Sequence, residues 1–199
     1  MIVQPPDSTG FAHSFRFRSA LPSDGAPLWR LVQAAGTLEL NSAYFYLLFA
    51  TDFGRTCLIA EEAGEVVGAV IGYHPPEQAD TAFVWQIGLL PRLQGQGLGV
   101  ELLKQWIALP ANQSCRWVTA TVADDNAASK ALFQRFAQHS GAACHVQSHF
   151  TADLFPVGHP PEPLYRIGPI AGHAFPAETE GKPAVSAAVR RDRTTAPAA

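Results

Sequence analysis

The chain has 199 residues, of which 47% are hydrophobic and 16% are charged, and its formal net charge is −3. This length and apolar content suit one domain with a hydrophobic core and disfavour two large domains. The mildly acidic balance gives no general attraction to phosphate backbones or anionic lipid, so nucleic acid and membranes are not expected partners. We therefore expect a small-molecule substrate.

The targeting and cysteine patterns are those of a cytoplasmic protein. The start lacks a basic region followed by a long apolar stretch, and no apolar run approaches the length of a membrane span. Cys57, Cys115 and Cys144 lack the close pairing of a zinc site, and the histidines lack metal-ligand spacing, which predicts reduced thiols and no metal. Residues 1–13 are predicted to be a flexible leader, 14–169 the folded domain, and 170–199 a disordered tail rich in small residues and prolines.

The first half of the domain is predicted to hold a strand, two helices and a hairpin. "FRFRS" (15–19) alternates apolar and polar residues like a strand, and a helix capped by Ser23 or Asp24 carries Leu28, Leu31 and Val32 on one side. "NSAYFYLLFATDF" (41–53) is expected to form an aromatic helix that covers a pocket. "TCLIAEEAGEVVGAVIGYHPP" (56–76) predicts two strands joined by a tight turn near "EEAGE".

Strands and helices then alternate. We expect strands at 81–91, 116–122, 144–150 and 163–167, and helices at 100–109 and 126–141, the second ending at a glycine. No internal repeat or heptad pattern is present. This order predicts an α/β (α+β) fold with a mixed sheet.

The segment "RLQGQGLGVELL" (92–103) places Gly95, Gly97 and Gly99 between a strand and a helix. Unpaired N–H groups at a helix start bind anions, and glycines leave room for phosphate. A dinucleotide fingerprint is disfavoured, because the spacing, an early βαβ unit and an acidic residue after the next strand are missing. A purely structural turn remains an alternative.

Three segments together resemble the GNAT acyltransferase superfamily over roughly residues 15–168. Gln94, Gly97 and Gly99 occupy its pyrophosphate-binding signature, "FVWQIGLLP" (83–91) stands at its central strand, and "NAASKALF" (126–133) resembles its second signature. The resemblance implies the GNAT fold: a mixed, mostly antiparallel central sheet flanked by helices, in which the strands at 81–89 and 116–122 splay apart.

The resemblance also implies acetyl-CoA as co-substrate, and direct attack of an amine on the thioester in a ternary complex. The residues that it assigns to acetyl-CoA, partly through main-chain groups, are Ile87, Leu89, Gln94, Gly95, Gln96, Gly97, Leu98, Gly99 and Asn126. Capping its own helix would equally explain Asn126. Phe133 stands where many relatives have a tyrosine that protonates the departing thiolate, so that donor is replaced or unnecessary; a thiol pKa near ~8.5 lets the thiolate leave unaided.

Four further stretches look like the L-2,4-diaminobutyrate acetyltransferase family of ectoine biosynthesis: "LELNSAYFYLL", "GYHPPEQADTAFVWQIGLLP", "FTADLF" and "GHPPEPLYRIGP". Glu39 replaces the family's usual aspartate. This resemblance implies acetylation of the terminal (4-) amine, a role in osmotic stress, and a homodimer. The residues that it places at the substrate are Glu39, Tyr44, Trp85, His159 and Glu162; a surface charge and core aromatics remain alternatives for the first three.

His159 and Glu162 are also the candidate catalytic residues. A terminal alkylamine with a pKa near ~10 is about one part in a thousand free base at neutral pH, so a group must accept its proton. Gln86 stands where relatives sometimes place a catalytic glutamate, and an amide cannot act as a base. Two alternative functions stay open: acetylation of another small amine, and a non-catalytic acyl-CoA-binding module.

Overall fold

The computed structural model describes residues 14–156 and 158–170. Its strands are β1 (Arg16–Ser19), β2 (Leu58–Glu62), β3 (Glu65–Tyr73), β4 (Thr81–Leu89), β5 (Trp117–Thr121), β6 (Ala143–Phe150) and β7 (Glu162–Gly168). Its helices are α1 (Gly25–Ala35), α2 (Ala43–Asp52), α3 (Leu98–Ile107) and α4 (Ala127–His139). Short 3-10 turns occupy connections: η1 (Pro22–Asp24), η2 (Gly54–Thr56), η3 (Pro91–Leu93), η4 (Pro110–Asn112) and η5 (Ala152–Leu154).

These elements match the predicted order of strands and helices. The predicted leader (1–13) and residues 171–199 of the predicted tail lie outside the described residues. Ile170, the first residue assigned to the tail, is buried in the core and donates its N–H to the Arg116 carbonyl at 2.8 Å.

The strands form one seven-stranded sheet in the order β1-β2-β3-β4-β5-β7-β6. Every neighbouring pair is antiparallel except β4 and β5, which run parallel. The predicted mixed, mostly antiparallel sheet is therefore confirmed.

A local capping signal accounts for the start of α2 but not for that of α1. The Ser42 hydroxyl accepts the Phe45 N–H at 3.2 Å and begins α2, as its position before an apolar run predicts. Asp24 precedes α1 but does not cap it. Its carboxylate instead accepts the Leu21 N–H at 2.7 Å and two bonds from the Arg18 guanidinium at 2.6 and 2.8 Å, so it ties β1 to the start of α1.

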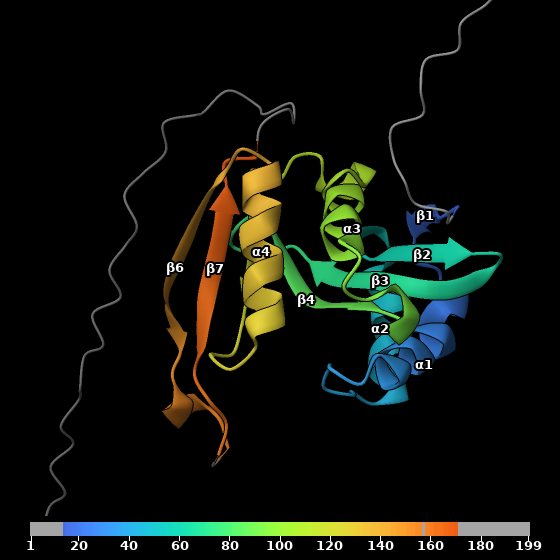
Figure 1. Cartoon of the computed structure of the whole chain (residues 1–199), viewed down its shortest axis with the longest axis horizontal. Coiled ribbons are helices and arrows are strands. Elements are labelled where there is room, and N and C mark those ends of the chain that lie inside the picture. Colours follow the sequence, from blue (N-terminus) through green and yellow to red (C-terminus); the bar gives the residue numbers. More distant parts are fainter. Residues whose placement is uncertain (1–13, 157, 171–199) are drawn as a thin grey trace, which may run out of the picture.

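Helices cover both faces of the sheet. Figure 1 shows α3 and α4 side by side over one face, and their core includes the fully buried side chains of Leu103, Trp106 and Phe136. A second core lies under α1 and α2 and includes Leu28 and Ile59. Among the described residues, no helix is long and apolar enough to cross a membrane.

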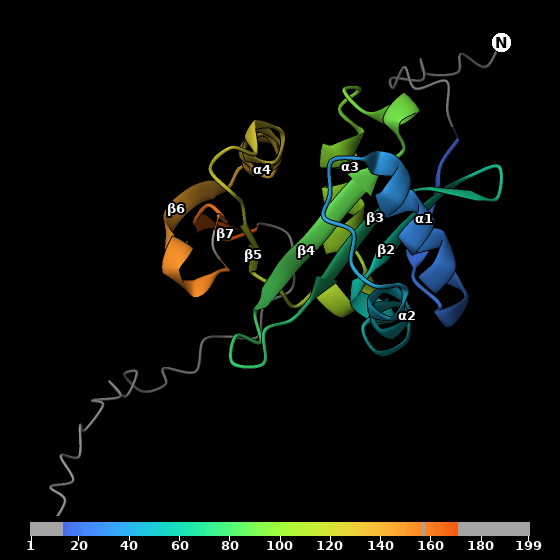
Figure 2. The same ribbon diagram turned by 90° about the horizontal axis from the view of Figure 1, so that it is seen from below.

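The parallel pair at the centre of the sheet is short. Only Thr81–Phe83 of β4 pair with Trp117–Thr119 of β5. Beyond these residues the two strands diverge, which is visible as a V in Figure 2. The predicted splay of the strands is confirmed, and α3 and α4 each begin beyond the diverging end of one of them.

Candidate active site

A cleft of about 520 Å³ occupies the opening between β4 and β5. It is bounded by the connection between α1 and α2, by β4 and β5, by the start of α4, and by β6, β7 and the segment between them. Its size is in the range of pockets that hold small ligands. The predicted site residues that line it are Glu39, Trp85, Ile87, Asn126, His159 and Glu162.

A β-bulge in β4 directs Trp85 into this cleft. Gly72 of β3 pairs with Val84 and Ile71 pairs with Gln86, so Trp85 is the extra residue. The bulge shifts the alternation, and Val84 and Ile87 consequently pack in the same core although they are three positions apart. Sequence periodicity alone would have placed them on opposite faces.

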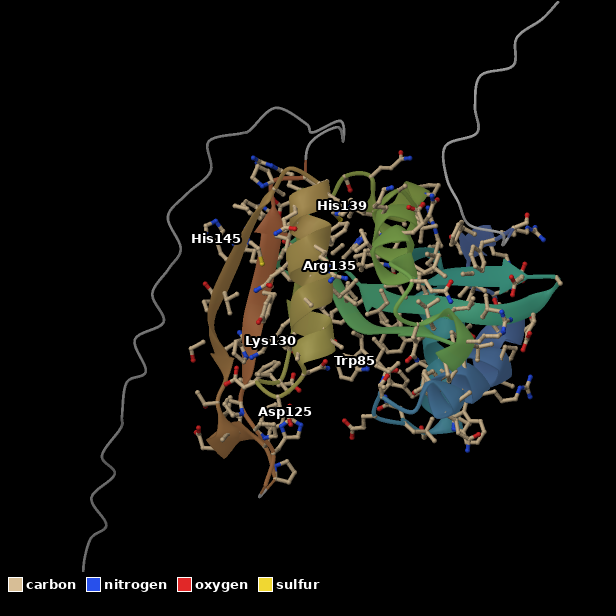
Figure 3. The ribbon with its side chains drawn as sticks, viewed as in Figure 1. Trp85, Asp125, Lys130, Arg135, His139 and His145 are labelled. Atoms are coloured by element: carbon tan, nitrogen blue, oxygen red, sulfur yellow. The ribbon has the colours of Figure 1, made fainter. Side chains whose placement is uncertain are left out.

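Trp85 forms part of an aromatic wall. Its side chain is 48% exposed, and its ring lies 5.7 Å from Phe45 and 6.5 Å from Phe49 of α2, centroid to centroid. Tyr73 and Phe83, whose rings are 5.1 Å apart, continue the wall within the cleft. In Figure 3, Trp85 lies between α4 and the connection that joins α1 to α2. The predicted helix α2 thus backs the pocket wall.

The β5 side of β4 has main-chain groups that no strand takes up. Among the described residues, none of Val84–Leu89 has a strand partner on that side. Ile87 lines the cleft, whereas Leu89 lies at the end of the strand outside it. An extended ligand chain could therefore hydrogen-bond along this edge as a further strand would.

The glycine-rich loop before α3 is exposed and has unbonded N–H groups. Gly95 and Gly97 have φ of 74° and 79°, and a Cβ at either position would meet nothing within 4 Å. Within the described part of the chain, no hydrogen bond takes up the N–H groups of residues 95–99, and the Val100 N–H reaches the Gly97 carbonyl at 3.2 Å. Unpaired donors at a helix start form an anion-binding site.

Gly99 has a different role from the other two glycines. It lies within α3, and a Cβ there would come 3.0 Å from the Leu132 Cδ1 of α4. This glycine lets α3 and α4 approach each other. The structure therefore divides the three glycines between the exposed turn and helix packing.

The glutamines of the loop brace it from within. The Gln94 side chain donates to the Leu89 carbonyl at 2.9 Å and to the Ala35 carbonyl at 3.4 Å. The Gln96 side chain donates to the Arg92 carbonyl at 2.8 Å. Leu98 is buried in the core under α3. In this structure these three side chains hold the loop in place, and the exposed main chain is left to contact a ligand.

Asn126 begins α4 at the edge of the cleft. Its side-chain oxygen accepts the Ser129 N–H at 3.0 Å, so it caps the helix as its position suggested. Ser129 and Phe133 follow on the cleft side of α4. Phe133 is only 3% exposed and packs against Tyr165 at 6.3 Å. Its ring offers the cleft an apolar surface and no hydroxyl.

His159 and Glu162 lie together at the cleft, as their spacing suggested. The His159 Nδ1 is 2.7 Å from the Pro160 carbonyl, which can only accept, so Nδ1 carries a hydrogen, and in the neutral ring Nε2 is then the proton acceptor. Stacking on Phe155, with centroids 3.9 Å apart, fixes the ring plane. The Nε2 lies 3.9 Å from Glu162 Oε1, and Glu162 Oε2 accepts the Thr121 hydroxyl at 2.6 Å. The pair is thus an oriented proton-accepting group.

The structure separates Glu39 and Tyr44, two of the five residues predicted to contact the acceptor. Glu39 is exposed and lines the cleft, whereas Tyr44 is 71% exposed on α2 and is outside the cleft lining. Tyr46, two positions later, is the buried tyrosine, and its hydroxyl donates to Gln86 Oε1 at 3.3 Å. A glutamine within an apolar strand was the sequence signal for this pair, because a buried amide needs partners.

Within the part of the chain that the structure describes, the thiols and other titratable groups do not form a metal site. The described residues contain no group of three or more His, Cys, Asp or Glu that could hold a metal ion. Cys57, Cys115 and Cys144 are unpaired thiols. Burial raises the pKa of Cys57 and of Cys115 to about 11, which keeps both thiols protonated and unreactive.

Comparisons with known proteins agree with this geometry. The model of the acetyltransferase (GNAT) family matches residues 26–137. The chain is 42% identical over 148 residues to an L-2,4-diaminobutyric acid acetyltransferase of Nocardia farcinica, covering 74% of this chain and 77% of the relative. It is 40% identical over 148 residues to the enzyme of that name from Shouchella clausii, covering 74% and 83%.

Solved structures resemble the whole described domain. The diaminobutyrate acetyltransferase EctA of Paenibacillus lautus, solved with L-2,4-diaminobutyric acid and coenzyme A, matches with a TM-score of 0.75 and 32% identity. The match covers 81% of this chain and 98% of that one. Ard1 of Thermoplasma volcanium, with a TM-score of 0.63 and 17% identity, shares the fold.

Proposed function

The chain belongs to the acetyltransferase (GNAT) family, and on that premise we propose that it transfers the acetyl group of acetyl-CoA to the 4-amino group of L-2,4-diaminobutyrate. The observation that carries the proposal is a cleft in which the open edge of β4 meets an acidic and aromatic pocket containing Glu39, Trp85, His159 and Glu162. The relatives' names and the ligands of the P. lautus enzyme support the same substrates.

The residues around the loop fit acetyl-CoA, which would supply an activated acetyl thioester. The N–H groups of residues 95–99 would hold its diphosphate, since Gly95 and Gly97 leave the approach open. Ile87 and its strand edge would hold the pantetheine arm through main-chain groups, with Leu89 at the end of that edge. Asn126 retains its amide N–H₂ for a polar contact while its oxygen caps α4.

Position must decide which amine reacts, because the 4-amine is the more basic of the two and is therefore the more fully protonated at neutral pH. We assign Glu39 to the amino-acid end of the substrate, where its carboxylate attracts an ammonium group. The faces of Trp85 and Phe83 would pack on the short alkyl chain and attract a cation. Fixing one end of the acceptor orients the other toward the thioester.

The His159–Glu162 pair would accept the proton that the attacking amine loses. Nε2 of His159 is the acceptor that the Pro160 bond leaves available, and Glu162 stabilises the resulting imidazolium. The Thr121 hydroxyl keeps the Glu162 carboxylate oriented. With Phe133 in the cleft instead of a tyrosine, the thiolate departs without a protein hydroxyl at that position.

One observation favours a second candidate acceptor. Tyr44 does not line the cleft, so the contact with diaminobutyrate that was expected of this residue is missing from this arrangement. Another small diamine that needs only the acidic end and the Trp85 wall would fit the same pocket.

The wider setting is part of the proposal. We place the enzyme in the cytoplasm, in ectoine biosynthesis under osmotic stress, as a homodimer. The exposed apolar side chains of Tyr44 and Leu47 on α2 offer a surface for a second copy. Light scattering of the purified protein would give the molecular mass of two chains if the dimer is correct and of one chain if it is wrong.

The function is tested with purified protein, acetyl-CoA and L-2,4-diaminobutyrate. We expect release of free CoA and, by NMR of the product, an acetyl group on the 4-amine. A panel of other small diamines distinguishes the second acceptor. Binding of acetyl-CoA without turnover of any amine would favour a non-catalytic binding module.

A further inference from the structure

We infer that Gln86 and Tyr46 are positioning residues: together they hold the cleft wall that carries Glu39. The inference rests on the proposed function for the role of Glu39 and goes beyond it for the two buried residues. Tyr46 lies outside the cleft lining, and Gln86 lines the cleft with both polar atoms of its amide already bonded to Tyr46 and to Glu39. They act through the segment between α1 and α2.

That segment, residues 36–42, is a cleft wall with few attachments of its own. Thr37, Leu38, Glu39 and Asn41 all line the cleft. Within the described part of the chain, residues 37–41 make no hydrogen bond from main chain to main chain. A wall of this kind keeps its shape only if side chains from elsewhere bind its backbone.

Gln86 and Tyr46 supply those bonds on both sides of Leu40. The Gln86 Nε2 donates to the Glu39 carbonyl at 2.7 Å. The Asn41 N–H donates to the Tyr46 hydroxyl at 3.2 Å, and that hydroxyl donates to Gln86 Oε1 at 3.3 Å. The bonds form one continuous chain from Glu39 to Asn41 through β4 and α2.

Burial makes the loss of any one of these bonds costly. Tyr46 is 0% exposed and Gln86 is 8% exposed, so removal of one member would leave buried polar groups without partners. The chain also explains why an amide stands at position 86. That side chain must donate to a carbonyl and accept from a hydroxyl at once, which a carboxylate cannot do.

Gln86 directly follows Trp85, the bulged residue of β4. The same stretch of β4 therefore sets the aromatic wall through Trp85 and the acidic wall through Gln86. We expect the two walls to keep a fixed separation, which is what an acceptor held at one end and reacting at the other requires.

The test is a double-mutant cycle with Y46F and E39A. Y46F removes the hydroxyl and keeps the buried ring. We expect it to raise KM for diaminobutyrate about three- to tenfold, the range of one net hydrogen bond, with KM for acetyl-CoA unchanged. In the E39A background Y46F should add less than a twofold change, because the residue that it positions is gone.

The matched control is T51V, which also removes a hydroxyl from α2. In the described structure the Thr51 hydroxyl donates to the Leu47 carbonyl at 2.8 Å and has no part in the chain of bonds. T51V should leave both KM values unchanged. Q86M is the second variant: it keeps the length of the side chain and removes both bonds. It should raise KM for diaminobutyrate in the same way as Y46F, so the proposal can be judged even if Y46F fails to fold.

Hydrogen–deuterium exchange gives a readout that is independent of the acceptor. The Asn41 amide, whose N–H donates to the Tyr46 hydroxyl, should exchange faster in Y46F and Q86M than in the wild type, while β3 and α3 keep their protection. Unchanged exchange of this amide, or an equal effect of Y46F with and without Glu39, would overturn the inference. If the wild type fails to acetylate diaminobutyrate and the variants still loosen the segment, the proposed function falls and the positioning role stands.

Discussion

The anion site is most sharply tested by Gly97→Val. At φ 79° a valine is strained by about 1–2 kcal/mol, although nothing lies within 4 Å of the added Cβ. At about 2–4 °C per kcal/mol this lowers Tm by roughly 2–8 °C, and the protein stays folded. The branched side chain would cover the open approach to the N–H groups of residues 95–99. Loss of one charge-assisted hydrogen bond, about 1.5–3 kcal/mol, weakens coenzyme A binding roughly tenfold to a hundredfold.

Calorimetric titration measures the affinity for coenzyme A, and two controls accompany it. S-acetylpantetheine has the thioester arm and no diphosphate, so Gly97→Val should bind it as the wild type does. Gly141→Val introduces the same kind of strain at φ 61°, also with nothing within 4 Å of the Cβ, after α4. It should lower Tm similarly and leave coenzyme A affinity unchanged. Equal losses for both ligands, or no loss for coenzyme A, would refute an anion site at this loop.

Three further outcomes are expected. Glu162→Gln should lower kcat by about a hundredfold or more with unchanged acetyl-CoA binding, measured by steady-state kinetics and titration; a kcat near wild type would remove Glu162 from proton transfer. Burial alone raises the pKa of Asp24, but bonds from Arg18 and the Leu21 N–H outweigh it and leave that pKa below the ordinary 3.8. The stability that this pairing contributes is therefore present in full above pH 3.8, and it is lost as pH falls through the lowered pKa of Asp24 in the folded protein. In urea unfolding, the advantage of the wild type over Asp24→Asn should be constant at pH 5–7 and shrink below about pH 4; an advantage independent of pH would contradict this. Because burial raises the pKa of Cys57 to about 11, its thiol should react with a disulfide reagent at pH 8 only after unfolding, as followed by mass spectrometry of peptides.

Much of the fold could be predicted because its signals are local. Ser42 and Asn126 begin their helices through bonds to residues three positions later, which a sequence displays directly. The glycine-rich loop has the same character, since the positive φ at Gly95 and Gly97 is a property of short-range geometry. The GNAT resemblance rested on the glycine-rich loop, the strand at 83–91 and the segment 126–133, and the comparisons with known proteins agree with it.

The details of the acceptor side could not be predicted in this way. Tyr44 and Tyr46 are two positions apart on α2, and the sequence did not indicate which would be buried against Gln86. The bulge at Trp85 depends on how β3 pairs with β4. After the bulge, each residue of β4 points to the opposite face of the sheet from the one that simple alternation would give. Strand pairing joins segments that are apart in the sequence, so no local pattern displays it.

The sequence by itself determined the order of elements, the caps of α2 and α4 and the exposed glycine turn, because each depends on backbone preferences within a few residues. Only the tertiary structure decided which side chains share the cleft. Glu39, Trp85, Asn126 and His159 come from four separate segments, and the hydrogen bonds of Gln86 and of Glu162 join residues about 40 positions apart. Those partners are chosen by how the sheet splays and how α2 packs on it, which no single stretch of the chain contains.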